Sequence, residues 1–469
     1  MTYGQLNAGL IEELQSLLKI PVKYDEESMD RYSRDETAEL KAVRPEVVTF
    51  PVSTEEVSEI MRFANRHLIP VTPRGAGTGL SGGAVPSYHG IVMSFEKMNR
   101  ILEFDEANMM ITVEPGVITG EIQKLADRHN LVYGGDPCSS ESSSIGGNVA
   151  ENAGGNKVMK YGPTGYHVYG LEVVLPSGEV TYFGGKRLKD VSGLDFVHLM
   201  VGSEGTLGIV TKITLRLLPK PKYSVALLVP YPDIDTAIAA VPGLMSGSGV
   251  VPTSLEFMDG SSIRAACSFL NIEFPYSDAG AHLIIEVEGN SKDSIFDDYV
   301  KLGEAAIEAG GLEAFVADNR NTRDKLWKAR KSIAEALAAI SPVHSMEDVS
   351  VPMANIPKLI KRSEEIAKKR GLEMIAFGHA GDGNVHVTFI KGDLPKEEWD
   401  RNLPLAEKEL FDETTELGGC ISGEHGIGIK RKKYLASIVD KVQLDLIRSI
   451  KKAFDRNNIL NPGKIVDLR

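Results

Sequence analysis

Hydrophobic positions recur along this chain with two different periods, and each period predicts a different element. Apolar residues from Val57 to Ala64 follow a capping box at Ser53–Glu56 with helical spacing, so we expect a helix that ends near His67. A weaker helical pattern covers residues 11–18. Strand-like apolar segments stand at 68–72, 90–95, 101–104, 109–113 and 213–217. The first half therefore consists of short strands separated by glycine-rich loops.

The region from Tyr223 to Leu417 is richer in helical patterns than the first half of the chain. Amphipathic helical spacing appears at 304–308, 326–337 and 359–369, and strand-like segments lie between these at 281–287 and 374–377. This alternation of helices and strands predicts a separate α+β domain.

The segment from Gly378 to His386 carries a hairpin signal and two imidazoles. Asp382-Gly383 is typical of a two-residue type I′ turn, and such a turn pairs His379 directly with His386. Directly opposed side chains share one face of a sheet with Cβ atoms roughly 5 Å apart, so both rings can reach one cation. The pattern predicts half of a metal site, with a satisfied polar pair in a sheet as the alternative.

A second glycine-punctuated loop, at 423–428, offers the missing ligand. Glu424 would complete a set of two histidines and one carboxylate that leaves coordination positions open for a substrate. His425, one residue later, could then act as a base. The alternative for this segment is an ordinary surface loop.

Three tracts of small residues stand at 73–83, 136–155 and 202–210. Gly77, Gly79 and Gly82 match G-x-G-x-x-G, but strand-like residues follow where a dinucleotide-binding fingerprint needs a helix, so we reject that interpretation. The five glycines of the first tract leave backbone N–H groups unobstructed, as in a pyrophosphate cradle. Alone, this tract is equally compatible with a flexible loop.

Composition narrows the class of protein. The 469 residues, 42% of them hydrophobic, suit two or three globular domains, and the net charge of −13 argues against nucleic acid or an anionic membrane as partner. No apolar run approaches the ~20 residues of a transmembrane segment, so we expect a cytoplasmic protein. The three cysteines contain no C-x-x-C, which excludes an iron–sulfur cluster built by this chain alone.

The three tracts, the His hairpin, the 423–428 loop and Asn461–Lys464, in this order, resemble the FAD-linked oxidases of the vanillyl-alcohol-oxidase superfamily. Within that superfamily they are similar to bacterial D-lactate dehydrogenases and the flavin subunit of glycolate oxidase, with D-2-hydroxyglutarate dehydrogenase as a near relative. The resemblance implies an α+β fold: a two-part VAO/PCMH-type FAD-binding domain with an inserted α+β substrate (cap) domain. The expected boundaries are 1–220 for the FAD domain, 221–415 for the cap and 416–469 for a segment that returns to the FAD site.

Residue by residue, the resemblance assigns the metal to His379, His386 and Glu424, the general base to His425 and the substrate carboxylate to Arg330 of a W-x-x-R motif. From the residues alone, Arg330 is better read as a solvated helix residue. Neither His nor Cys occurs in the first tract, so we expect noncovalent FAD, with Cys138 as the one position where covalent attachment stays open. The positions assigned to FAD are Pro73, Arg74, Gly75, Ala76, Gly77, Thr78, Gly79, Asp136, Ser143, Gly146, Gly147, Asn148, Gly154, Glu204, Gly205, Ile209 and Asn461.

The implied activity is oxidation of a small D-2-hydroxy acid, D-lactate or glycolate, to the 2-oxo acid by an FAD-dependent dehydrogenase. A divalent metal (Zn, Mn or Fe) would bind the substrate, His425 would take the hydroxyl proton and a hydride would pass to FAD. Ala334 and a position near Met346 replace the Thr and Lys that contact the distal carboxylate in dicarboxylate-using relatives, which favours a monocarboxylate.

Electrons would then leave to a separate acceptor, such as an electron-transferring flavoprotein or an iron–sulfur subunit. A homo-oligomer or a hetero-complex is compatible with this chemistry, and a partner could hold the protein at a membrane surface. Two alternatives stay open: an O2-using alcohol or sugar oxidase of the same fold, and a noncatalytic FAD-binding subunit of a redox complex.

Overall fold

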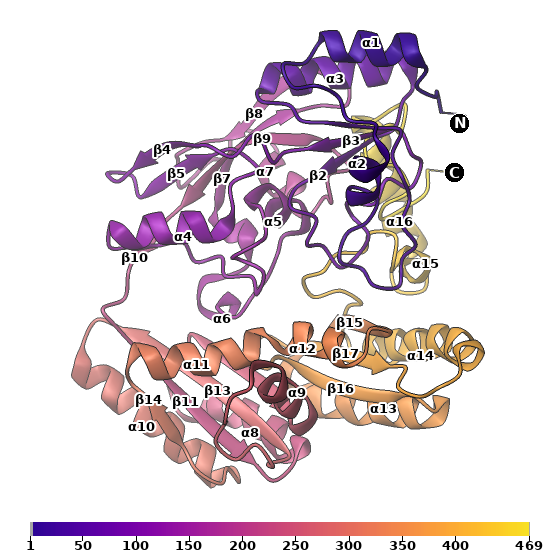
Figure 1. Ribbon diagram of the computed structural model, residues 1–469. Helices are drawn as coiled ribbons and strands as arrows, with labels where there is room; N and C mark the ends of the chain where they lie inside the picture. The colour runs from indigo at the N-terminus through magenta and orange to yellow at the C-terminus, as the bar shows by residue number, and fades with distance from the viewer. Residues whose placement is uncertain (1–2, 469) are drawn as a thin grey trace. The chain divides into compact units, whose positions relative to one another are not determined.

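The computed structural model describes residues 3–468, which form two compact units (Figure 1). Unit 1 contains the chain through Gly154 together with residues 162–220 and 424–468. Unit 2 contains residues 155–161 and 221–423. The chain thus leaves unit 1 twice, once for the short segment 155–161 and once for the long insertion that ends at Gly423.

Unit 1 is built on two main sheets. A parallel sheet has the order β1-β3-β2, and an antiparallel sheet has the order β4-β5-β9-β7-β8. A third pair joins β6 to β10. The strands are β1 (Val47–Thr49), β2 (Val71–Arg74), β3 (Ile91–Ser94), β4 (Ile101–Asp105), β5 (Met110–Val113), β6 (Leu131–Val132), β7 (Val168–Val174), β8 (Val180–Gly184), β9 (Ile209–Arg216) and β10 (Leu218–Pro219).

Each main sheet of unit 1 has its own apolar core. Helix α3 packs buried Val57, Ile60 and Phe63 against the parallel sheet, and strand β9 alternates buried and half-buried residues against the second core. The helices of unit 1 are α1 (Ala8–Ser16), α2 (Glu26–Arg31), α3 (Thr54–His67), α4 (Thr119–Arg128), α5 (Ile145–Glu151), α7 (Phe196–Met200), α15 (Lys432–Leu435), α16 (Lys441–Phe454) and the 3-10 turn η1 (Thr164–His167). Throughout residues 3–468, each helix is too short or too polar to cross a bilayer.

The predicted capping box of α3 forms with one change. The Ser53 hydroxyl accepts the N–H of Glu56 at 3.3 Å, but the Glu56 carboxylate takes the N–H of Val52 at 3.0 Å rather than that of the cap residue. The helix ends at His67 as expected, because Leu68 adopts a left-handed conformation with φ 55°.

Unit 2 is a seven-stranded antiparallel sheet with the order β14-β11-β13-β12-β16-β17-β15. Helices α9, α11 and α12 pack on one face, and α8, α10, α13 and α14 pack on the other (Figure 1). The strands are β11 (Tyr223–Tyr231), β12 (Ser254–Asp259), β13 (Ala281–Gly289), β14 (Phe315–Ala317), β15 (His344–Ser350), β16 (Glu373–His379) and β17 (Asn384–Ile390).

The helices of unit 2 mostly follow the amphipathic patterns. The pattern at 326–337, read as one helix, is two helices that meet at Ser332. The elements are α6 (Val158–Tyr161), α8 (Ile234–Gly247), α9 (Gly260–Leu270), α10 (Lys292–Glu308), α11 (Arg320–Lys331), α12 (Ile333–Ile340), α13 (Ile356–Arg370), α14 (Lys396–Glu416) and the 3-10 turn η2 (Met353–Asn355).

The predicted register of the β16–β17 hairpin is wrong. His379 pairs with Asn384 and His386 pairs with Phe377, so the two histidines are not directly opposed. The strands are joined by the four residues 380–383 instead of a two-residue turn. The carbonyl of His379 accepts the N–H of Gly383 at 3.2 Å. Asp382 is not among the residues with positive φ, which a type I′ turn requires of both its central residues.

The observed pairing differs from the predicted pairing by two residues. Each side chain of the hairpin therefore stays on the predicted face of the sheet. Because side chains alternate with a period of two, a shift of two keeps both imidazoles on the same face of the sheet. The histidines become diagonal neighbours instead of direct partners, and the predicted proximity survives.

Gly383 is needed for this turn, and its replacement by Ala should destabilise unit 2. Its φ is +89°, and an added Cβ would lie 2.1 Å from the carbonyl oxygen of Val351. Gly371 is a matched control, with φ +67° and open space around its Cβ position. We expect Gly371→Ala to cost about 1 kcal/mol from backbone strain alone and Gly383→Ala to cost at least twice that in urea unfolding. Equal costs would contradict the turn geometry.

Candidate active site

A row of four polar side chains crosses one face of the unit 2 sheet. Glu256 on β12 pairs directly with His379 on β16, and Asp348 on β15 pairs directly with His386 on β17. Phe377, which pairs with His386, belongs to the apolar core beneath α9, α11 and α12, so the row lies on that face. The order of the strands alone places these four residues side by side.

The two imidazoles of the row are close and buried. Their ring centroids are 5.6 Å apart with the planes nearly perpendicular, and His379 and His386 are 3% and 4% exposed. The ring of Phe377 lies 5.1 Å from that of His386. The rings of Phe377 and His379 both contact the imidazole of His386 and restrict its orientation.

Glu256 orients His379 and also binds Arg330. One carboxylate oxygen lies 2.8 Å from Nδ1 of His379, and the other accepts from Nε of Arg330 at 3.0 Å and lies 2.9 Å from its Nη2. All three side chains are at most 3% exposed. Arg330 also lies over the ring of Phe377, 5.1 Å from its centroid. Since Nδ1 of His379 faces the carboxylate, Nε2 is the atom left for a ligand.

Asp348 is held at the other end of the row. Its carboxylate accepts from Nδ2 of Asn384 at 2.7 Å and from the hydroxyl of Ser422 at 2.9 Å, and its carbonyl accepts the N–H of Gly423 at 3.3 Å. Nδ1 of His386 lies 3.9 Å from this carboxylate. Asp348 therefore ties the chain just before Glu424 to the sheet that carries the histidines.

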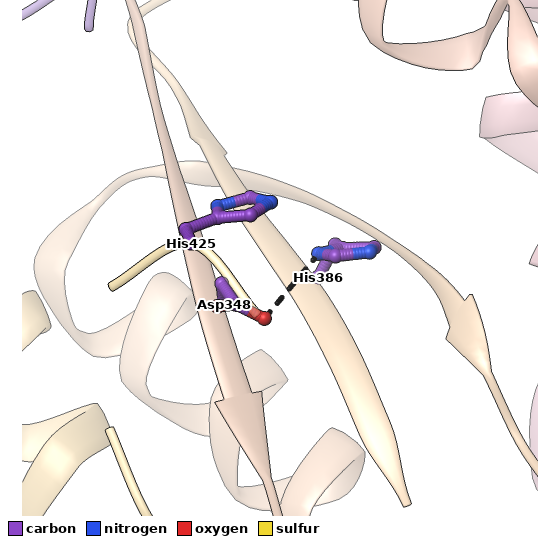
Figure 2. Close-up of side chains that lie close together, drawn as sticks. All are labelled: Asp348, His386 and His425. Atoms are coloured by element: carbon purple, nitrogen blue, oxygen red, sulfur yellow. Dashed lines mark ion pairs between the residues drawn. The ribbon is translucent and has the colours of Figure 1, made fainter. Parts of the chain in front are cut away.

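Glu424 and His425 follow Gly423 by one and two peptide bonds. Figure 2 draws the side chain of His425 together with those of Asp348 and His386 and marks the ion pair of the latter two. Oε1 of Glu424 lies 3.9 Å from Nε2 of His425. Both residues belong to unit 1, whereas His379 and His386 belong to unit 2.

Two groups of three residues could hold a cation. One is His379, His386 and Glu424, as expected from the sequence, and the other is Asp348, His386 and His425. In each group the ligand atoms lie within 4.8 Å of one another. Two imidazoles with one carboxylate are a donor set that suits Zn, Mn or Fe, so these residues fit a divalent transition metal.

The glycine-rich tracts converge within unit 1. An added Cβ at Gly75 would lie 2.2 Å from the hydroxyl of Ser144, and one at Gly205 would lie 2.9 Å from Pro73. At Gly154 it would lie 2.6 Å from the carboxylate of Glu424. Several of these glycines therefore permit one loop to approach another.

The side chains assigned to FAD have defined partners within unit 1. Nη1 of Arg74 donates to the carbonyl of Arg34 at 2.7 Å, and Nδ2 of Asn148 donates to the hydroxyl of Thr119 at 2.6 Å. Nδ2 of Asn461 donates to the carbonyls of Gly83 and Glu204 at 3.1 and 2.8 Å. Asn461 thereby fastens the first tract to the third.

The remaining assigned positions lie on the same loops. Ala76 is exposed, Thr78 and Gly79 are half-buried, and Ile209 is buried at the start of β9. Asp136 accepts from Gln123 at 3.3 Å. Gly77 faces the guanidinium of Arg74, and Gly146 faces Pro115, while Gly147 has only the Ser144 hydroxyl within 4 Å of its Cβ position. Cys138 is exposed.

The tracts also hold polar atoms that suit a ligand. The hydroxyl of Ser143 and Oδ1 of Asn461 are buried and have no hydrogen-bond partner among residues 3–468. Buried polar groups are normally satisfied, so such atoms fit a bound molecule rich in polar groups. The residues of unit 1 therefore fit FAD, through backbone and neutral side chains of the three tracts.

Two carboxyl groups lie buried between the tracts and the 423–428 loop. Burial raises the pKa of Glu204, while hydrogen bonds from the N–H groups of Ile427 and Gly428 act in the opposite direction. Burial and the neighbouring Glu204 raise the pKa of Glu151 further. Of this pair, Glu204 is the one that accepts two backbone N–H groups.

Lys464 is the cation beside this pair. Its ammonium donates to the carbonyl of Val85 at 2.7 Å and to the hydroxyl of Ser87 at 3.1 Å. Burial lowers its pKa to about 7, and the nearby carboxylates of Glu204 and Asp35 partly oppose that shift.

Sequence reasoning missed Glu256 and Asp348. Each is a charged residue inside a strand that is otherwise suited to burial, in Leu255-Glu256-Phe257 and Asp348-Val349. A carboxylate inside a buried strand needs a buried partner. That signal could have found both residues, although it does not identify the partner.

The comparisons with known proteins agree with this architecture. Residues 45–184 match the FAD binding domain family, and residues 220–465 match the family of FAD linked oxidases, C-terminal domain. The solved structure of p-cresol methylhydroxylase covers 99% of this chain and 98% of its own with a TM-score of 0.80 at 19% identity, which establishes the fold. The fold is of the VAO/PCMH type and its class is α+β, as predicted.

The chain belongs to the FAD-linked oxidases. It is 39% identical over 447 residues to glycolate oxidase subunit GlcD of Bacillus subtilis, covering 95% of this chain and 94% of the relative. It is 36% identical over 468 residues to D-lactate dehydrogenase of Anaerostipes hadrus, covering 99% and 98%. The resemblance inferred from the motifs is thereby confirmed.

Lys464 should make the stability of the protein rise with pH. Between pH 7 and 10.5 the unfolded chain keeps a proton on Lys464 that the folded chain has lost, so the free energy of unfolding increases with pH in this range. We expect the difference between wild type and Lys464→Met to grow by about 1 kcal/mol from pH 7.5 to 8.5 in denaturant unfolding. Lys452→Met, at an exposed position on α16, is the control. The same pH slope in both variants would contradict the assignment.

Proposed function

We propose that this protein is an FAD-dependent dehydrogenase that oxidises a small D-2-hydroxy acid, such as D-lactate or glycolate, to the 2-oxo acid with the help of a divalent metal. The observation that carries this proposal is the buried pair of His379 and His386 in unit 2, whose ring centroids lie 5.6 Å apart and whose strand partners include Glu256 and Asp348. A purely flavin-dependent alcohol oxidase has no need of such a pair. The similarity to a glycolate oxidase subunit and to a D-lactate dehydrogenase supports the same class of substrate.

FAD, when bound, supplies a two-electron acceptor, and a divalent cation, when bound, supplies a Lewis acid for the hydroxyl and carboxylate of the substrate. His379, His386 and Glu424 would hold the cation, and the tracts of unit 1 would hold FAD. Glu256 keeps Nδ1 of His379 occupied, so that Nε2 is the atom presented to a ligand.

His425 is the residue that we assign as the general base. It would take the hydroxyl proton of the substrate, and FAD, when bound, would supply the acceptor for the hydride from C2, so that the two electrons and two hydrogens of the alcohol are accounted for. The pair of His425 and Glu424 suits this role because Glu424 faces Nε2 of the imidazole at 3.9 Å.

Arg330 would balance the substrate carboxylate. Its Nε donates to Glu256 and its Nη2 lies 2.9 Å from the same carboxylate, whereas Nη1 is not part of that ion pair. A buried guanidinium that shares one carboxylate with His379 can accept one further negative charge. Met346 pairs with Thr388 on the same face of the sheet and Ala334 lies in α12, so neither position supplies a charge for a second carboxylate. This favours a monocarboxylate substrate.

Reduced FAD would pass its electrons to a separate protein, either an electron-transferring flavoprotein or an iron–sulfur subunit. The cysteines of the chain, Cys138, Cys267 and Cys420, form no disulfide and are far apart in the sequence, so a cluster would have to come from a partner. A cytoplasmic protein, alone or in a complex with such a partner, is the setting in which we place this activity.

Anaerobic addition of substrate tests the proposal. We expect D-lactate or glycolate to bleach the flavin absorbance of the purified protein, with L-lactate and D-2-hydroxyglutarate much less effective. Removal of metal with a chelator should slow bleaching by at least roughly 100-fold because substrate is no longer oriented or acidified, while FAD stays bound. Adding back Zn²⁺, Mn²⁺ or Fe²⁺ should restore the rate.

Two results would overturn this assignment. One is rapid bleaching by the metal-free protein, which would favour an oxidase without a metal requirement. The other is a flavin that no 2-hydroxy acid reduces, although the protein holds FAD and metal, which would favour a noncatalytic subunit.

Glu256 should control metal affinity through His379. In Glu256→Gln the charge that holds the Nδ1 proton is lost, and we expect the affinity for Zn²⁺ to fall roughly 10- to 100-fold in a competitive chelator titration. Glu286→Gln is the matched control, because Glu286 is also buried in the sheet, on β13, and bonds Ser224 instead of a histidine. Glu256→Gln leaves the buried charge of Arg330 without its carboxylate partner, which could unfold the variant. In that case the double variant Glu256→Gln/Arg330→Met, which also removes the charge of Arg330, is measured instead. Equal Zn²⁺ affinity in the Glu256 and Glu286 variants would refute the role.

A further inference from the structure

Glu204 makes a two-point contact with the loop that follows Glu424 and His425. One carboxylate oxygen accepts the N–H of Ile427 at 2.7 Å, and the other accepts the N–H of Gly428 at 2.7 Å. Glu204 is 5% exposed. Two successive backbone N–H groups directed at one anion form a small anion-binding concavity, and charge-assisted bonds of this kind are about twice as strong as neutral ones.

The same loop is packed too tightly to drift away from Glu204. Gly426 has φ +85°, and an added Cβ there would lie 2.2 Å from Oε2 of Glu151 and 3.1 Å from Oε1 of Glu204. The carbonyl of Ser81 accepts the N–H of Ile429 at 2.9 Å and lies 2.1 Å from the Cβ position of Gly428. Residues 426–429 are thus anchored on three sides within unit 1.

Glu204 is itself held in an unusual backbone conformation. Its φ is +51°, which costs a residue with a Cβ roughly 1 kcal/mol or more. Its N–H donates to the carbonyl of Ala150 at 2.8 Å, and its own carbonyl accepts from the side chain of Asn461 at 2.8 Å. A strained residue that is fixed from both sides of its backbone presents its carboxylate in one direction only.

We propose that Glu204 is a positioning residue that fixes Glu424 and His425 by clamping the two amides of Ile427 and Gly428. Family resemblance assigned Glu204 to FAD, whereas the geometry directs both carboxylate oxygens to the 423–428 loop. The inference rests on the proposed function for the roles of Glu424 and His425. The clamp itself consists of contacts within unit 1.

Glu204→Gln tests the clamp, because the side-chain amide offers one acceptor oxygen and turns an NH2 group towards the second N–H. We expect FAD content to stay at the wild-type level, the rate of flavin reduction at saturating D-lactate or glycolate to fall roughly 10- to 100-fold, and Zn²⁺ affinity to fall. Hydrogen exchange at residues 424–430 should become faster. A residue that only stabilised the fold would leave the reduction rate of the folded protein unchanged.

Glu172→Gln is the matched control. Glu172 is also a buried glutamate of unit 1, but its carboxylate binds Thr54, Thr211 and Lys212. None of these three partners belongs to the 423–428 loop. This variant should lose stability and keep the reduction rate and the Zn²⁺ affinity. If Glu204→Gln does not fold, Glu204→Asp keeps the charge with a shorter reach and should show the same losses in weaker form.

Two outcomes would overturn the proposal. Loss of FAD affinity with an unchanged reduction rate in the FAD-saturated variant would make Glu204 a flavin ligand. Identical behaviour of the Glu204 and Glu172 variants would leave Glu204 with no positioning role. If no hydroxy acid reduces even the wild type, the proposed function fails, while Zn²⁺ affinity and hydrogen exchange still decide whether the clamp exists.

Discussion

The structure depends on the pairing of four polar side chains that are buried on one face of the unit 2 sheet. Glu256, His379, His386 and Asp348 stand in one row across four neighbouring strands, where the other side chains of that face form an apolar core. Burying charged and polar groups is unfavourable unless each is paired. Glu256 is satisfied by Arg330 and His379, and Asp348 by Asn384 and Ser422, which leaves two oriented imidazoles between two fixed acids.

The glycine-rich tracts allow loops of unit 1 to pack unusually close together. Glycines at 75, 154, 205 and 426 allow loops of unit 1 to approach one another to distances that any Cβ would prevent. The same compactness brings Asn461, Glu204 and the 423–428 loop together. A glycine-rich loop therefore does more than expose N–H groups to a phosphate, because it also permits the contacts that hold the 423–428 loop.

Much of this arrangement could be predicted from the sequence, and the limits have physical causes. Periodicity found α3 and the strands β2, β3, β4, β5 and β9 of unit 1, since local spacing and caps determine these elements, but it missed the other strands of that unit. The hairpin turn was predicted two residues too short, because Asp-Gly also fits longer loops, yet the period of two in a strand kept His379 and His386 on one face. Glu256 and Asp348 could not be placed, since their partners lie on strands and helices distant in sequence. The clamp of Glu204 on Ile427 spans 223 residues and leaves no local pattern.

The central claim is that two imidazoles and one carboxylate bind a single divalent ion. X-ray absorption spectroscopy of the protein loaded with one equivalent of Zn²⁺ measures this directly. The account predicts two imidazole nitrogens and at least one carboxylate oxygen around the ion, with one imidazole lost in His379→Ala and in His386→Ala. A spectrum that neither substitution changes would place the ion elsewhere and contradict the account.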